Sequence, residues 1–433
     1  MKYRIKFDKA CLVIQLVIYL FLVLYKSDVM LLLNFLFSFI ISVKLCKDNS
    51  KENFLLSNFF VLFSLIFFLY GISASLVQFV FFGHIFSDYY NATILYAACF
   101  PALLIGMSKK KFINTRKYYF DNLKNIKIKP RIFFIVLTLL LIYKVISFYK
   151  QGTLFNFSAY TSNRLELLKD TSQLDVVVGL LLTGSYLYLI YYFPKLSFKN
   201  KFLLCGLTIF YIFIQISAGN RRDFVPIILG FMWVIANVKK IKFNIIMLSL
   251  FIIGIIFFNI LAVFRTQSEE TFDRSAVIEN SFKYNEFVFP FETLKYEVND
   301  YIDDKTTLRY GSTILINSTT IFVPREIFPQ KPNSLAYDFV MDRFSGGIGY
   351  AYLPITEFFI NFGFVGCIIC FYFLGNFFLF YYNSINQRVI FLCYALIFDF
   401  CRGEISGLIY NFVFTSLFLV IIPIFYKGLI RSK

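Results

Sequence analysis

The stretch Ile321–Gly363 reads IFVPREIFPQKPNSLAYDFVMDRFSGGIGYAYLPITEFFINFG, and it holds the densest set of polar groups in an otherwise apolar chain. Its prolines fix the backbone and its glycines allow sharp turns, which is typical of a connecting segment. Its charged side chains are Arg325, Glu326, Lys331, Asp338, Asp342, Arg343 and Glu357. From Leu353 onward the same stretch becomes a long apolar run. A charged connection that leads into an apolar helix indicates either a solvated link or a functional site.

Composition sets the class of protein. The 433 residues are 58% hydrophobic, 21% aromatic and only 16% charged, with a mean hydropathy of +0.68. A soluble protein of this size needs far more polar surface, so the sequence predicts an all-α, polytopic integral membrane protein. The beginning, MKYRIKFDK, leads directly into an apolar run and is interpreted as the start of an uncleaved first span.

Cysteine and histidine are unpromising as metal ligands. The eight cysteines lie almost all in or beside apolar runs and are interpreted as packing residues, including the Cys367–Cys370 pair. The single histidine, His84, cannot build a metal site or a catalytic triad alone. We therefore expect no metal and no cofactor.

Membrane spans follow from the apolar runs, because each span needs roughly 20 apolar residues. About twelve are predicted, at residues 10–25, 29–45, 54–80, 92–107, 131–149, 176–193, 202–218, 224–238, 243–264, 353–381, 389–400 and 404–426. This divides the chain into nine spans within 1–264, a large external loop over 265–352 and three further spans within 353–433. The loop is expected to hold short helices near 275–302 and 334–345, and the segment 313–323 is too short to span.

Lysine and arginine set the orientation. The basic segments are the N-terminal tail, the connection after the fourth span, PKLSFKNK, NVKKIKFN and the tail YKGLIRSK. All fall on one side if twelve spans alternate, so both termini are predicted to be cytoplasmic. No nucleic-acid partner is expected, because the net charge of +17 flanks membrane spans.

Arginine dominates the basic residues on the predicted external side, whereas lysine dominates inside. A guanidinium offers a planar fork that pairs bidentately with phosphate or carboxylate. Two interpretations stay open: an external phosphate-binding cleft, or arginines that pair with external acids and lipid headgroups. The external arginines are Arg164, Arg221, Arg222, Arg265, Arg274, Arg309, Arg325, Arg343 and Arg402.

Two short turns place charge at the external surface. The turn SAGNRRDF puts Arg221 and Arg222 beside a helix N-terminus, which suits an anion, although Asp223 is able to neutralise one of them. The turn DFCRGEIS puts Arg402 and Glu404 at one membrane depth. Ionisable residues there are costly and tend to be functional, but a self-contained Arg402–Glu404 ion pair is the alternative.

The order of these motifs carries a resemblance. GNRRDF, a large external loop, VPREIFPQKPNSLAYDF, ITEFFINFGFVG and RGE follow one another as in the Wzy-type O-antigen and capsular polysaccharide polymerases, which the chain resembles in topology over most of its length. The resemblance implies undecaprenyl-pyrophosphate-linked oligosaccharide repeat units as substrates, within the lipid bilayer of a bacterial inner membrane. It implies transfer of the growing chain onto a new lipid-linked unit. A chain-length regulator and a flippase are the protein partners to look for.

The residues fit that chemistry. A glycosyl pyrophosphate is already activated, so no nucleotide site is needed, and the leaving group calls for preorganised cations. The acceptor is a sugar hydroxyl, for which a carboxylate base is useful, with Glu357 the first choice and Glu326 also considered. The expected catalytic residues are Glu357, Arg325, Arg402 and Glu404. The expected substrate-binding residues are Arg221, Arg222, Lys331, Asp338 and Arg343.

Two rival functions remain. A glycan ligase uses the same lipid carrier and also external arginines, but the RGE turn and the VPREIFPQKP loop favour the polymerase. A lipid-linked oligosaccharide flippase or other transporter is expected to carry charges along a central path in the membrane. Here Lys144 is the main charge within a predicted span.

Overall fold

The structure is a computed structural model that describes residues 2–49, 58–108, 119, 123, 130–152, 154, 173–217, 223–239, 241, 286–323, 325, 327–344, 351–382, 387–417 and 419. Within these ranges the elements are helices, with no strand. All of them therefore satisfy their backbone hydrogen bonds internally, as a chain inside lipid must.

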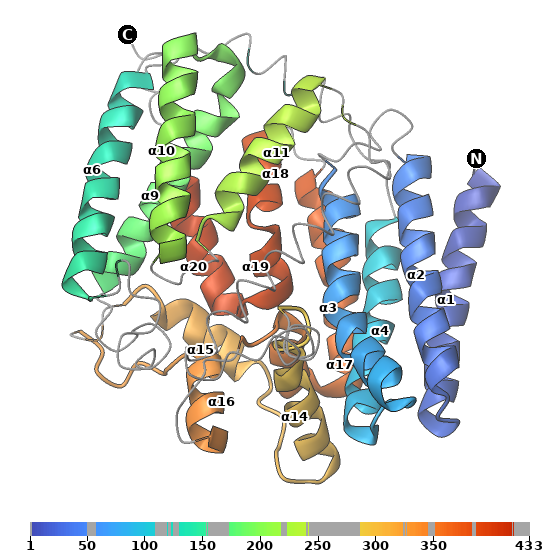
Figure 1. Cartoon of the computed structure of the whole chain (residues 1–433). Helices are drawn as coiled ribbons and strands as arrows, with labels where there is room; N and C mark the ends of the chain where they lie inside the picture. Colours follow the sequence, from blue (N-terminus) through green and yellow to red (C-terminus); the bar gives the residue numbers. More distant parts are fainter. Residues whose placement is uncertain are drawn as a thin grey trace.

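Helices of the first half form two groups, seen side by side in Figure 1. The first group is α1 (Lys2–Leu24), α2 (Asp28–Asn49), α3 (Phe59–Phe82) and α4 (Ser87–Met107). The second is α6 (Pro130–Lys150), α9 (Gln173–Tyr191), α10 (Phe198–Ser217) and α11 (Val225–Lys239), with the short 3-10 helix η1 (Phe193–Lys195) after α9.

Helices of the last third join the two groups. They are α17 (Pro354–Tyr382), α18 (Gln387–Ala395), α19 (Ile397–Arg402) and α20 (Ile405–Ser416). α17 packs on α4, α18 on α11, and α20 on α9. The C-terminal segment thus brings the 399–405 turn close to the N-terminal end of α17.

By length and composition, seven described helices are able to cross a membrane, namely Asp28–Cys46, Phe59–Phe82, Ser87–Met107, Pro130–Lys150, Leu174–Tyr191, Phe198–Ser217 and Pro354–Phe380. The last of these contains the break at Gly363 that is described below. Lys9–Leu24, Val225–Lys239 and Ile405–Ser416 are shorter apolar helices. The chain is therefore a multi-pass membrane protein. The count of twelve stays a prediction: the predicted span 243–264 lies outside the described residues, and 389–400 is divided between α18 and α19.

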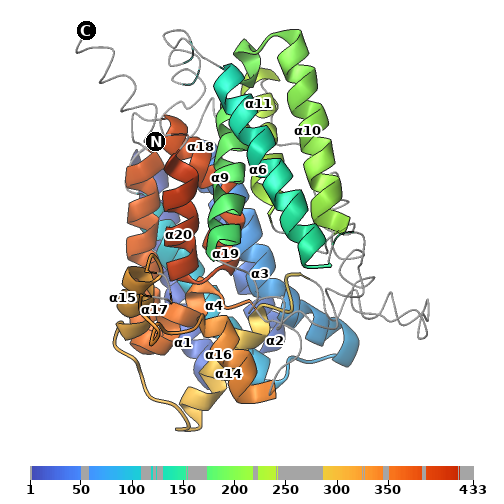
Figure 2. The same cartoon turned by 90° about the vertical axis from the view of Figure 1, so that its left-hand side faces the viewer.

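Three short helices occupy one end of the bundle. They are α14 (Phe291–Ile302), α15 (Ser312–Thr320) and α16 (Leu335–Phe344), and we call the described residues of 286–344 the cap. Two of them match the helices predicted near 275–302 and 334–345, although residues 275–285 lie outside the described ranges. Figures 1 and 2 both show these helices at the end of the bundle opposite the start of α1.

The single span predicted over 353–381 needs correction, because α17 is two helices joined at Gly363, where φ is 67° and ψ is −167°. The Cys367 Sγ lies 3.6 Å from the Ile355 carbonyl oxygen. In a continuous helix residues twelve apart would be separated by roughly 18 Å along the axis. The chain therefore reverses at Gly363, and a short helix, residues 354–362, lies against the start of the longer one.

Glycines allow α4 and α17 to approach closely. A Cβ on Gly106 would meet the carbonyl oxygen of Tyr372, and a Cβ on Gly375 would meet that of Leu103. Small residues at such crossings are the usual means by which membrane helices bring their backbones together.

Candidate active site

Glu357 lies in the first turn of the short helix 354–362 and is fully buried. Its Oε2 accepts a hydrogen bond from the backbone N–H of Ile405 at 2.7 Å. Its Oε1 has no hydrogen-bond partner among the described residues. An unpaired buried carboxylate oxygen is costly, so Oε1 is the atom of Glu357 that is available to a further partner.

The turn between α19 and α20 contributes Arg402 and Glu404. Arg402 forms an ion pair with Glu286, in the turn before α14, and its Nε is buried without a partner in the described part of the chain. Glu404 accepts a hydrogen bond from the backbone N–H of Ala336 at 2.8 Å, at the N-terminal end of α16. The sequence allowed an ion pair between Arg402 and Glu404. In the structure each of these residues instead contacts a different part of the cap.

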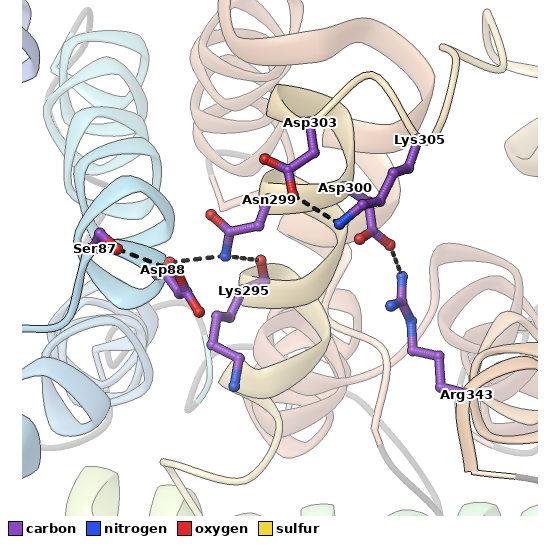
Figure 3. A network of polar contacts seen from close by, with 8 residues as sticks. All are labelled: Ser87, Asp88, Lys295, Asn299, Asp300, Asp303, Lys305 and Arg343. Atoms are coloured by element: carbon purple, nitrogen blue, oxygen red, sulfur yellow. Dashed lines mark hydrogen bonds and ion pairs between the residues drawn. The ribbon is translucent and has the colours of Figure 1, made fainter.

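Arg343 forms an ion pair with Asp300, and Figure 3 shows it reaching from α16 toward α14. Its guanidinium lies 5.0 Å from the ring centroid of Tyr296 and 5.1 Å from that of Phe339. On the far side of α14, Asn299 donates to the Asp88 carbonyl oxygen at 3.2 Å, which ties the cap to α4. Arg343 therefore joins α14 to α16.

Arg325 and Lys331 lie in the connection between α15 and α16, and Asp338 lies in the first turn of α16. The exposed Arg325 donates to Asn333 Oδ1 at 2.8 Å, and Asn333 donates to Asp338 at 3.0 Å. The Lys331 ammonium donates to the carbonyl oxygens of Ile321 and Val323, each at 2.9 Å. These contacts order the connection, and substrate contact by the three residues stays a prediction.

Glu297 on α14 is a further carboxylate near the site. It accepts a hydrogen bond from Tyr352. Burial raises the pKa of Glu297, and the charges of Arg343 and Arg309 offset this only in part. The buried Tyr352 is within electrostatic reach of Glu297, Glu357 and Glu404.

Some of the remaining predicted site residues lie outside the part of the chain that the structure describes. Arg221, Arg222 and Glu326 lie outside the described residues. Within the described ranges no group of three or more His, Cys, Asp or Glu side chains is able to hold a metal ion. Asp300 pairs with Arg343 and Asp303 with Lys305, at 2.8 Å for the latter pair.

Four distant segments thus meet at the cap end of the bundle: the turn before α14, the N-terminal end of α16, the short helix with Glu357, and the turn after α19. A model of the family described as O-antigen polysaccharide polymerase Wzy matches residues 9–433. The chain belongs to this family. No curated protein and no solved structure matches it. Membership in the Wzy family supports an O-antigen polymerase role for this membrane protein.

Sequence reasoning did not single out Glu286 and Glu297, which lie beside the candidate site residues Arg402 and Tyr352. Neither lies in a short motif, and both belong to the polar segment that precedes the RGE turn by more than a hundred residues. The only available signal was the scarcity of acids: the chain has 26 Asp and Glu residues, and several of them lie in the segment 286–304.

Proposed function

We propose that the protein polymerises undecaprenyl-pyrophosphate-linked repeat units at the external membrane face. The observation that carries the proposal is the meeting of Glu357, the Arg402–Glu286 pair and Glu404 at one end of the bundle. This set combines a buried carboxylate with a guanidinium group at one end of the bundle. A polymerase that uses a lipid-pyrophosphate donor needs that combination.

In the proposed reaction, the acceptor hydroxyl of the incoming unit attacks the anomeric carbon of the growing chain. The new C–O bond forms while the bond from that carbon to the pyrophosphate oxygen breaks, and its electron pair leaves with undecaprenyl pyrophosphate. Glu357 takes the proton from the acceptor hydroxyl. Its Oε1 is the atom for this step, because Oε2 is occupied by Ile405.

Arg402 is the proposed cation for the pyrophosphate, with Arg325 and Arg343 as further contacts. A guanidinium placed before the reaction stabilises charge on the leaving group without reorganisation. Glu404 holds the N-terminal end of α16 through Ala336, which fixes the cap over the turn that carries Arg402.

The test is the lipid-linked glycan profile of a strain that lacks the protein. Single repeat units on the carrier, without a ladder of longer chains, support a polymerase. Full-length chains on the carrier point to a ligase instead, and units retained on the cytoplasmic face point to a flippase. Complementation by the unchanged gene must restore the ladder, and complementation by Glu357→Gln must not.

A further inference from the structure

Glu286 forms an ion pair with Arg402, whose guanidinium is the proposed cation for the pyrophosphate. The pair lies between the turn before α14 and the end of α19, and its side chains are 16% and 26% exposed for Glu286 and Arg402. Partial exposure means that the pair is open to exchange with a dissolved anion. A fully buried pair would be much more costly to separate.

The segment that carries Glu286 is held in place by its neighbours. Phe287 and Val288 are buried, and the Phe287 ring lies 4.9 Å from that of Tyr70 on α3. Glu286 is therefore held at this place by the packing of its neighbours, so Arg402 is able to pair with it again after the guanidinium has moved.

Arg402 is incompletely satisfied in this arrangement. It pairs through Nη1, while its buried Nε has no partner in the described part of the chain. An unpaired buried N–H costs free energy, which favours movement of the guanidinium to a position where this N–H is hydrogen-bonded. A phosphate group accepts from several N–H groups of one guanidinium at once.

We propose that Glu286 is an internal competitor for Arg402 that returns to it when undecaprenyl pyrophosphate leaves, and so speeds product release. This inference rests on the proposed function. A ligand binds only to the fraction of the protein in which its binding group is available, so its apparent affinity is lowered in proportion to that fraction. By pairing with Arg402, Glu286 reduces the fraction in which Arg402 is available. A polymerase must release one carrier lipid per addition, so a site that holds pyrophosphate too tightly is slow.

The first measurement is the binding of farnesyl pyrophosphate to the purified full-length protein. Glu286→Gln keeps the shape of the side chain and removes its charge, so the affinity is expected to rise roughly tenfold. The matched control is Asp303→Asn, which removes the acid of the exposed Asp303–Lys305 pair in the same cap and is expected to leave the affinity unchanged. Adding Arg402→Gln to Glu286→Gln is expected to abolish the gain.

The second measurement separates the first addition from later ones. In Glu286→Gln, repeated additions are expected to slow more than the first addition, and added farnesyl pyrophosphate is expected to inhibit them more strongly. A purely structural Glu286 predicts the opposite sign, with weaker binding and a lower melting temperature, and that result would overturn the inference. If the wild type binds the probe and forms ladders but Glu286→Gln binds no more tightly, only the inference fails. If the wild type binds no probe, the pyrophosphate donor itself is wrong.

Discussion

Glu357 Oε2 accepts the backbone N–H of Ile405 at 2.7 Å, so one buried carboxylate both belongs to the short helix 354–362 and holds the turn that carries Arg402. The proposed base and the proposed cation are therefore positioned by the same hydrogen bond.

Glu357→Gln separates these two roles. The glutamine oxygen is still able to accept from Ile405, so protein levels in the membrane are expected to stay near normal. The amide does not accept a proton, so polymerisation is expected to fall by roughly 10²–10⁴-fold. Ladder length and protein level are measured together, and a full ladder from Glu357→Gln would exclude Glu357 as the base.

Arg402→Lys keeps the positive charge and loses the planar fork. We expect strongly reduced polymerisation at near-normal protein level, and a loss of roughly 10²-fold or more for Arg402→Ala. Arg325→Lys is expected to act in the same direction.

Arg131→Lys is the matched control for these variants, because Arg131 is exposed at the first turn of α6, at the other end of the bundle. It is expected to keep the ladder. Unchanged ladders from both Arg402→Lys and Arg325→Lys would show that these side chains serve Glu286 and Asn333 rather than the pyrophosphate.

Lys331→Met tests whether this lysine orders its own connection. It removes two hydrogen bonds to the carbonyl oxygens of Ile321 and Val323 and leaves those oxygens without that donor. A loss of about 1–3 kcal/mol in stability is expected, read as a lower melting temperature in detergent. An unchanged melting temperature with a large loss of activity would instead favour direct substrate contact.

Glu297→Gln should make stability less dependent on pH. Because burial raises the pKa of Glu297, its neutral form is favoured by folding, and the stability it contributes is present below the ordinary carboxyl pKa of 4.5. That contribution is lost as pH rises from 4.5 through the raised pKa. Melting temperatures of the variant and the wild type are expected to diverge in the variant's favour across this window, and a constant difference would contradict it.

Gly375→Leu should separate α4 from α17. The added side chain meets the Leu103 carbonyl oxygen, and overpacking of this kind costs about 1–3 kcal/mol or more. Gly206→Leu on α10 is the control, because nothing lies within 4 Å of a Cβ there. Protein level and melting temperature in detergent distinguish the two, and equal values would show that the close approach is dispensable.

The long apolar runs made most of the fold predictable. Helices α1 to α4, α6 and α9 to α11 coincide with predicted spans, because an apolar run of that length has few alternatives to a membrane helix. The reversal at Gly363 was not predictable, because the run 353–381 is continuous and a single glycine is common in membrane helices.

The candidate site was only partly predictable. The RGE turn drew attention to Arg402 and Glu404, and the need for a carboxylate base drew attention to Glu357. The structure brings these three together. The ion-pair partner of Arg402 could not be predicted from the sequence, because Glu404 lies two residues away and yet Arg402 pairs with Glu286. Such choices depend on how the cap docks on the bundle, which no local pattern records.

The reversal at Gly363 also affects how the protein responds to the thickness of the lipid bilayer. The carbonyl oxygens of Ile360 and Asn361, beside the reversal, accept from the backbone N–H groups of Arg309 and Tyr310 at 2.9 and 3.0 Å. The short helix with Glu357 is thus tied to the cap by main-chain bonds, while only the part of α17 after Gly363 is long enough to follow the hydrocarbon. A thinner or thicker bilayer tilts the long helices, whereas these main-chain bonds keep the carboxylate in place relative to the cap. Polymerisation should accordingly vary little between bilayers of short-chain and long-chain lipids.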